Sequence, residues 1–160
     1  MDNSNPGVTF DGNGQCTCCR DALARKPREW WPTDGGRGRL NLQIERIKQE
    51  MADRPYDVII GLSGGVDSAY VAHMLRRDFT LRILAIHVDG GWNSEAAVRN
   101  IELLVRKLEI DLHTHVVEWH EMRDLQLAYL KASVVNQDVP QDHAFFSALY
   151  RLAKKYGQRY

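Results

Sequence analysis

The stretch that decides the fold is IIGLSGGVDSAY, residues 59–70. An apolar run ends here in a serine and two glycines, and a helical pattern begins near Asp67 and Ser68. A strand that passes directly into a helix presents unpaired backbone N–H groups at the positive end of the helix dipole. Gly64 and Gly65 let the backbone come close to phosphate oxygens, while Ser63 and Ser68 add hydroxyl donors. The stretch therefore predicts an anion site.

The aspartate inside this turn limits which anions the turn can bind. A carboxylate at position 67 does not suit bare phosphate, but it suits phosphates that carry Mg²⁺, or it caps N–H groups of the loop itself. An ordinary glycine turn with Asp67 or Ser68 as the N-cap of the helix would explain the glycines and the cap as two unrelated features. It would not explain the whole string between a strand and a helix. The pattern G-x-x-x-x-G-K-[ST] is missing from the sequence, so this is not the lysine-bearing phosphate loop.

Short apolar runs alternate with helical patterns from Tyr56 onward, which is typical of an α/β protein with a parallel sheet. Two of the strands are continuously apolar, as expected where both faces of the sheet are covered. The expected strands are residues 58–62, 81–88 and 112–119, and the expected helices are residues 40–52, 66–75, 93–108, 121–132 and 143–156. Gly157 is placed to end the last helix in a left-handed conformation.

Composition limits the function classes. Lysine plus arginine equals aspartate plus glutamate at 21 each, so no overall basic field favours nucleic acid or an anionic membrane. No stretch of about 18 apolar residues and no secretory signal pattern occurs in the 160 residues, so we expect a cytoplasmic protein with no membrane association.

The N-terminal part differs in composition from the rest. Residues 1–20 are rich in Asn, Asp and Gly and read as a turn-rich segment, and residues 25–39 hold two prolines and several glycines, which predicts a linker. We therefore divide the chain into a cysteine-containing segment and linker, residues 1–39, and a domain that carries the predicted anion site, residues 40–160. Trp30 and Trp31 either pin this linker to the domain or anchor a partner.

The three cysteines lie close together at positions 16, 18 and 19. Cys16 and Cys19 have the spacing of a zinc knuckle, which fits a metal site or reduced thiols better than a disulfide framework. A closed zinc site needs four ligands, and Cys18 supplies at most a third. The expected Zn²⁺ site is half present.

The string SGGVDS, after VIIGL and before a helix, resembles the pyrophosphate-binding loop of the PP-loop ATP pyrophosphatases, which share the adenine nucleotide alpha hydrolase-like fold. The resemblance implies a three-layer α/β fold with a parallel sheet, and ATP with Mg²⁺ as ligands. The residues that it implies at the nucleotide are Leu62, Ser63, Gly64, Gly65, Asp67 and Ser68 in the loop, and His87, Val88 and Asp89 at the end of the second strand. It also implies that Asp67 and Asp89 are the catalytic carboxylates, with Asp89 on metal or ribose.

A longer resemblance covers nearly the whole sequence. GVTFDGNGQCTCCR, the segment HVDGGWNSEAAVRN with its continuation to Trp119, and VPQDHAFFSALYRLAKKYG are similar to the N-acetyl sugar amidotransferases of lipopolysaccharide and surface-polysaccharide assembly. The resemblance implies that an acetamido oxygen of a sugar is adenylated and that ammonia from a glutaminase subunit displaces AMP to leave an acetamidino group. Asp142 and His143 then either face the sugar or serve as a helix cap and a half-buried histidine.

In that family a second C-x-x-C precedes the first residues of this sequence, and a further strand follows the helix that Gly157 ends. The resemblance thus implies a fragment that is open at both ends, with an α/β sheet incomplete at its C-terminal side. We expect residues 58–62 to have an unpaired edge, which favours self-association into a homo-oligomer.

Two other functions share the same turn. A transfer-RNA thiolase or another base-modifying enzyme would carry SGGVDS together with a basic face, which the balanced charge does not favour. A non-catalytic adenine-nucleotide-binding module would keep the phosphate turn without turnover. The products formed from ATP distinguish these alternatives.

Overall fold

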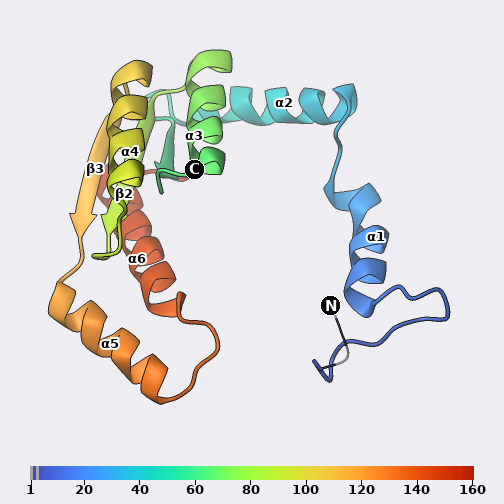
Figure 1. Cartoon of the computed structure of the whole chain (residues 1–160). Coiled ribbons are helices and arrows are strands. Elements are labelled where there is room, and N and C mark those ends of the chain that lie inside the picture. Colours follow the sequence, from blue (N-terminus) through green and yellow to red (C-terminus); the bar gives the residue numbers. More distant parts are fainter. Residues whose placement is uncertain (1, 3) are drawn as a thin grey trace. The chain divides into compact units, whose positions relative to one another are not determined.

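The computed structural model describes residue 2 and residues 4–160, and the chain divides into two compact units, residues 1–44 and 45–160. Figure 1 shows the elements of both units. Helix α2 (Asp34–Glu50) runs across the boundary between them. Within the described residues, no helix combines the length and the apolar character that crossing a membrane requires.

The second unit is built on a parallel three-stranded sheet in the order β1-β2-β3. Its strands are β1 (Val58–Gly61), β2 (Ile83–Asp89) and β3 (Asp111–Val116). The central strand β2 is buried along its length up to Val88, as its continuous apolar run predicts. Strand β3 ends three residues before the predicted Trp119, because Trp119 already belongs to the next helix.

Helices cover both faces of this sheet (Figure 1). They are α3 (Val66–His73), its π-helical continuation η1 (Met74–Asp78), α4 (Glu95–Leu108) and α6 (Val139–Tyr156). Helix α5 (Trp119–Lys131) lies beyond the arrowheads of β2 and β3 in Figure 1. The right-handed crossovers put α3 and α4 on one face. On the other face, Ile86 and Val88 pack against Ala148 and Leu152 of α6. The predicted three-layer α/β fold is confirmed.

Local chemistry sets the helix ends of this unit. Ser94, one of the two predicted caps, accepts a hydrogen bond from the Ala97 N–H at 3.2 Å. Gly157 has a φ of 63°, so the predicted left-handed end of α6 is confirmed. Helix α6 begins four residues before the predicted His143, because Pro140 lies in its first turn, where no backbone N–H is needed.

The predicted linker over residues 25–39 is largely helical instead. Helix α1 (Thr17–Glu29) continues through Pro27, and Arg25 forms ion pairs one turn away in both directions, with Asp21 at 2.9 Å and Glu29 at 3.2 Å. Helix α2 starts at Asp34, and its Gly36 is required because a Cβ there would lie 1.9 Å from the Trp31 carbonyl oxygen. The prolines and glycines therefore mark helix ends.

The two adjacent tryptophans lie between these helices and are exposed, Trp30 by 57% and Trp31 by 44%. Each contacts a cation of its own unit: Lys26 Nζ lies 4.8 Å from the centre of the Trp30 ring, and the Arg39 guanidinium lies 4.1 Å from that of Trp31. Cation–π contacts thus account for the position of both rings within the first unit.

The outer edge of β1 carries one main-chain hydrogen bond. The Ile59 N–H donates to the Tyr160 carbonyl at 2.9 Å, and the Gln158 side-chain amide donates to the Tyr56 carbonyl at 2.9 Å. The expectation of a fully unpaired edge over residues 58–62 is therefore wrong at Ile59, because the residues after α6 turn back toward the sheet.

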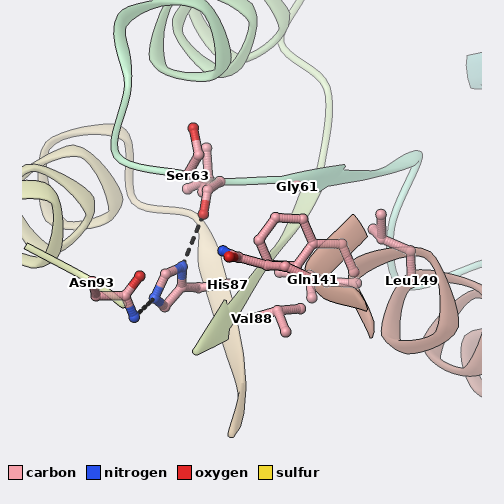
Figure 2. Close-up of a pocket in the computed structure, with 10 residues that line it drawn as sticks. Gly61, Ser63, His87, Val88, Asn93, Gln141 and Leu149 are labelled. Carbon is pink, nitrogen blue, oxygen red and sulfur yellow. Dashed lines mark hydrogen bonds between the residues drawn. The ribbon is translucent and has the colours of Figure 1, made fainter. Parts of the chain in front are cut away.

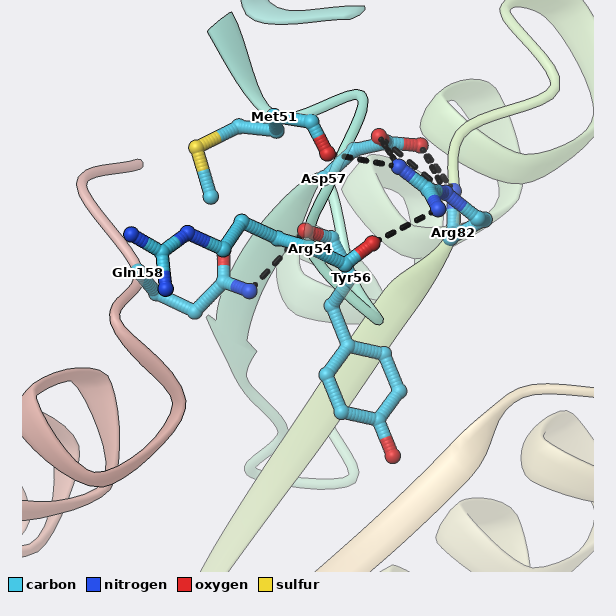
Figure 3. Close-up of polar contacts among 6 residues, drawn as sticks. All are labelled: Met51, Arg54, Tyr56, Asp57, Arg82 and Gln158. Atoms are coloured by element: carbon cyan, nitrogen blue, oxygen red, sulfur yellow. Dashed lines mark hydrogen bonds and ion pairs between the residues drawn. The ribbon is translucent and has the colours of Figure 1, made fainter.

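An ion pair between a buried aspartate and an exposed arginine fixes the start of the sheet (Figure 3). The carboxylate of Asp57, whose side chain is 6% exposed, accepts from the Arg82 guanidinium at 2.6 Å, and Arg82 also donates to the carbonyls of Met51 and Arg54. Burial raises the pKa of Asp57, but the hydrogen bonds and charge of Arg82 outweigh it and lower this pKa below its ordinary value. The pair joins the residues after α2 to the starts of β1 and β2.

We expect Arg82→Met to lower the free energy of unfolding by about 3 kcal/mol at pH 7, because it leaves a buried carboxylate without its partner. Since the pKa of Asp57 is lowered in the folded state, the pair stabilises above the ordinary aspartate pKa and its effect is lost as the pH falls through the folded value. Urea unfolding at several pH values measures this difference. The control Arg123→Met, which removes an exposed pair with Asp124, should change stability by less than about 1 kcal/mol, and equal losses in both variants would contradict the account.

Candidate nucleotide-binding site

The candidate site begins where β1 ends. Leu62 is buried, and its N–H donates to the Ile86 carbonyl at 2.8 Å, so the chain stays paired with β2 for one residue beyond the strand. Its carbonyl accepts from Nδ1 of His87 at 3.0 Å, and Nε2 of His87 accepts from the Asn93 side-chain amide at 3.1 Å. Both bonds are satisfied together by a neutral imidazole protonated on Nδ1. His87 therefore ties the ends of β1 and β2 to the start of α4.

The turn that follows depends on Gly64, whose φ is 79°. A Cβ at this position would lie 2.6 Å from the Ala97 carbonyl oxygen of α4, so a larger residue meets both backbone strain and a clash. The Gly64 carbonyl also accepts a hydrogen bond from the Asn100 side chain at 3.2 Å. Helix α4 thus holds the glycine turn from one side.

The two serines brace the turn from within. Their hydroxyl oxygens lie 3.2 Å apart, Ser63 Oγ accepts from the Gly65 N–H at 3.3 Å, and Ser68 Oγ accepts from the Ser63 N–H at 3.3 Å. A turn closed in this way is organised before any ligand arrives. Such preorganisation reduces the entropy that binding must overcome.

Helix α3 then begins at Val66 with Gly65 as its N-cap residue. The alternative of Asp67 or Ser68 as the N-cap is wrong, because both lie inside the helix. Within the described part of the chain, no side chain forms a capping hydrogen bond at the start of this helix. The N–H groups of its first turn therefore stay available at the positive end of the helix dipole. Asp67 is exposed beside them.

A cavity of about 290 Å³ opens next to this turn, at the carboxyl ends of β1 and β2 (Figure 2). Four predicted residues line it, namely Leu62, Ser63, His87 and Val88. It is also lined by Gly61, Ile86 and Asn93 and by three residues of α6, namely Gln141, Phe145 and Leu149. The three α6 residues are spaced by four and therefore lie on one face of the helix. This spacing can be read from the sequence, but it does not show what that face contacts.

The other predicted residues lie around this cavity. Asp89 lines a neighbouring cavity of about 450 Å³ between α4 and β3, which it shares with His87 and Asn93. One of its carboxylate oxygens accepts from the Gly91 N–H at 2.9 Å. Asp142 and His143 are exposed in the first turns of α6, so the expectation of a half-buried histidine is wrong, and Gln141 is the side chain that reaches the cavity.

The cysteines form a separate pair in the first unit. The Sγ atoms of Cys16 and Cys19 lie 3.4 Å apart, and the Cys19 N–H, which donates to Cys16 Sγ, lowers the pKa of the Cys16 thiol. No group of three or more candidate ligands gathers anywhere among the described residues. The pair supplies two of the four ligands that a structural zinc site needs, so these residues do not complete a site and zinc binding stays a prediction.

With the geometry described, known proteins can be compared. A family model described as NAD synthase matches residues 40–157, which is most of the chain. The chain belongs to the NAD synthase family. This places it among the PP-loop ATP pyrophosphatases, an enzyme superfamily, as the SGGVDS turn predicts. The finer likeness to the sugar amidotransferases is not tested by this match.

Curated relatives include GMP synthases described as glutamine-hydrolyzing. The GMP synthase of Pyrobaculum aerophilum is 34% identical over 92 residues, which cover 56% of this chain and 17% of the relative. The GMP synthase of Shewanella woodyi is 48% identical over 48 residues, which cover 30% of this chain and 9% of the relative. The chain thus matches less than a fifth of the length of either relative.

Two solved structures support the fold. A glutamine-dependent NAD⁺ synthetase from Acinetobacter baumannii, in complex with adenosine diphosphate, has a TM-score of 0.55 at 23% identity and covers 68% of this chain and 21% of that one. The NAD⁺ synthetase from Burkholderia pseudomallei has a TM-score of 0.52 at 19% identity and covers 87% of this chain and 66% of that one.

Sequence reasoning missed Asn100, whose role depends on the packing of α4 against the turn.

We expect Gly64→Ala to lower the free energy of unfolding by about 1–3 kcal/mol and to weaken binding of inorganic pyrophosphate about tenfold, because the strained turn must move away from α4. The matched control is Gly38→Ala in α2, where an added Cβ meets no atom within 4 Å. Thermal melting and calorimetric titration measure both effects. The assignment of the turn would be contradicted if the Gly64 variant bound pyrophosphate like the unmodified protein.

Proposed function

We propose that this chain supplies the ATP-binding part of an amidotransferase that converts an acetamido group of a sugar into an acetamidino group. One observation carries the ATP assignment: the uncapped start of α3 follows a glycine turn and opens beside a largely apolar cavity. The N–H groups suit the phosphates, and the cavity suits the adenine ring. Its volume of about 290 Å³ lies near the lower limit of small-molecule sites, which fits the nucleoside with the phosphates outside.

The proposed reaction has two balanced steps. The acetamido oxygen attacks the α-phosphorus of ATP, pyrophosphate leaves, and the amide nitrogen loses its proton to solvent to give an O-adenylated imidate. Ammonia then attacks the imidate carbon, the C–O bond breaks, AMP leaves with that oxygen, and the nitrogen loses a proton to solvent. The ammonia would come from glutamine through a glutaminase subunit, in keeping with the glutamine-dependent relatives named above.

The residues of the turn would act by position and charge. The N–H groups of Val66, Asp67 and Ser68 would hold the departing pyrophosphate, where such donors stabilise charge as it develops. Asp67 and Asp89 would hold Mg²⁺, which would neutralise part of the phosphate charge when bound. Both ring nitrogens of His87 already have partners, so this histidine positions the two strand ends and does not serve as a base.

The sugar substrate rests on the likeness of HVDGGWNSEAAVRN and the C-terminal helix to the sugar amidotransferases of polysaccharide assembly. Two alternatives lead to different products. A base-modifying enzyme would form AMP only with transfer RNA, and a binding module would form none. Measuring AMP with ammonium and an acetamido sugar, with transfer RNA, or with neither therefore separates the three functions.

We expect Gly65→Val to weaken ATP binding at least tenfold, since a branched side chain at the N-cap blocks approach to the N–H groups. Asp67→Ala should weaken ATP binding by a similar factor with Mg²⁺ and by less than threefold when EDTA removes it. Calorimetric titration measures both, and Asp53→Ala, which removes an exposed carboxylate before β1, is the control. Unchanged ATP affinity in both turn variants would refute the assignment.

A further inference from the structure

Trp92 is an exposed indole that is held in place. Its surface is 62% exposed, although it lies only three residues after the end of the largely buried strand β2. Its Nε1–H donates to Oε1 of Gln126 in α5 at 2.8 Å, and its ring packs edge-on against Trp119 with centroids 5.4 Å apart at 71°. The hydrogen bond and the ring contact hold the indole in one orientation, so that its exposed surface is available to a ligand with an apolar face.

The backbone is adapted to this arrangement. Gly91 has a φ of 87°, and a Cβ there would lie 2.6 Å from Cε3 of Trp119. The Val117 N–H donates to the Asp89 carbonyl at 2.9 Å, which joins the exits of β2 and β3 just before the two tryptophans. Both rings therefore sit on chain segments whose separation is fixed.

Three carboxylates lie near the two tryptophans along the chain. The Asp89 carboxylate accepts from the Gly91 N–H through one oxygen, while its other oxygen has no hydrogen-bond partner among the described residues. Glu118 and Glu121 are exposed next to Trp119 along the chain. These carboxylates repel a phosphodiester backbone but accept hydrogen bonds from hydroxyl groups.

Hydrogen bonds also connect this place to the phosphate turn. Asn93, the residue after Trp92, bonds to His87, and His87 bonds to the Leu62 carbonyl directly before Ser63. The indole therefore lies beside the proposed ATP site, at the carboxyl edge of the sheet where open α/β folds bind their ligands.

We propose that Trp92, braced by Trp119 and Gln126, is the platform for the pyranose ring of the acetamido sugar. A pyranose has an apolar face of C–H bonds and a rim of hydroxyls, which matches a fixed indole with exposed carboxylates near it in the chain. This inference rests on the proposed function for its substrate class. It assigns the sugar a place outside the adenine cavity.

The test uses the whole chain with UDP-N-acetylglucosamine as the sugar probe and UDP as its control. The chain contains four tryptophans, and each indole Nε1–H gives its own nitrogen–proton NMR signal that single substitutions assign. We expect the sugar nucleotide to shift the Trp92 signal and to leave those of Trp30 and Trp31 in place. Trp92→Ala should weaken sugar binding at least tenfold and Gln126→Leu about threefold, whereas Trp30→Ala should have no effect.

Three outcomes overturn the proposal: a Trp92 signal that stays in place at saturating sugar nucleotide, an equal shift with UDP alone, and unchanged sugar affinity in Trp92→Ala. ATP affinity is measured separately in the same variants. Loss of sugar binding with ATP affinity kept within twofold supports the platform. Absence of ATP binding in the unmodified chain refutes the proposed function instead, so the two failures can be told apart.

Discussion

The close approach of Gly64 to helix α4 is the contact on which the candidate site depends. The turn after β1 can follow its path only with a left-handed residue at this position and only with a hydrogen atom facing the Ala97 carbonyl. Asn100 fixes the same peptide group from the side. These contacts place the first turn of α3 beside the cavity, because they set the direction in which the chain leaves the strand.

Three parts of the structure around this contact supply different chemical groups to the candidate site. The sheet and α6 form the apolar walls, the start of α3 supplies N–H donors, and the loop after β2 supplies carboxylate and indole groups. His87 connects the three through its bonds to Leu62 and Asn93. A histidine with both nitrogens occupied suits a reaction in which positioning and charge matter more than proton abstraction.

The sequence predicted the strands, the helices and the glycine turn of the second unit because those signals are local. Apolar runs, helical spacing and a glycine turn each occupy fewer than about twenty residues, and Ser94 and Gly157 follow known capping rules. The errors arose at helix starts and at contacts between distant residues. Gly36 belongs to the first turn of α2, where the Trp31 carbonyl leaves no room for a Cβ, and Pro140 belongs to the first turn of α6. Asn100 and Gln126 act only through segments more than thirty residues away.

The central claim, that the uncapped start of α3 is the anion site, is tested most directly by backbone amide NMR shifts during titration with inorganic pyrophosphate and Mg²⁺. Helix α4 provides an internal control, because Ser94 caps its first turn. The account predicts large, saturable shifts at Val66, Asp67 and Ser68, and small ones at Ala96 and Ala97. Equal shifts at both helix starts, or no saturable shift at α3, would contradict it.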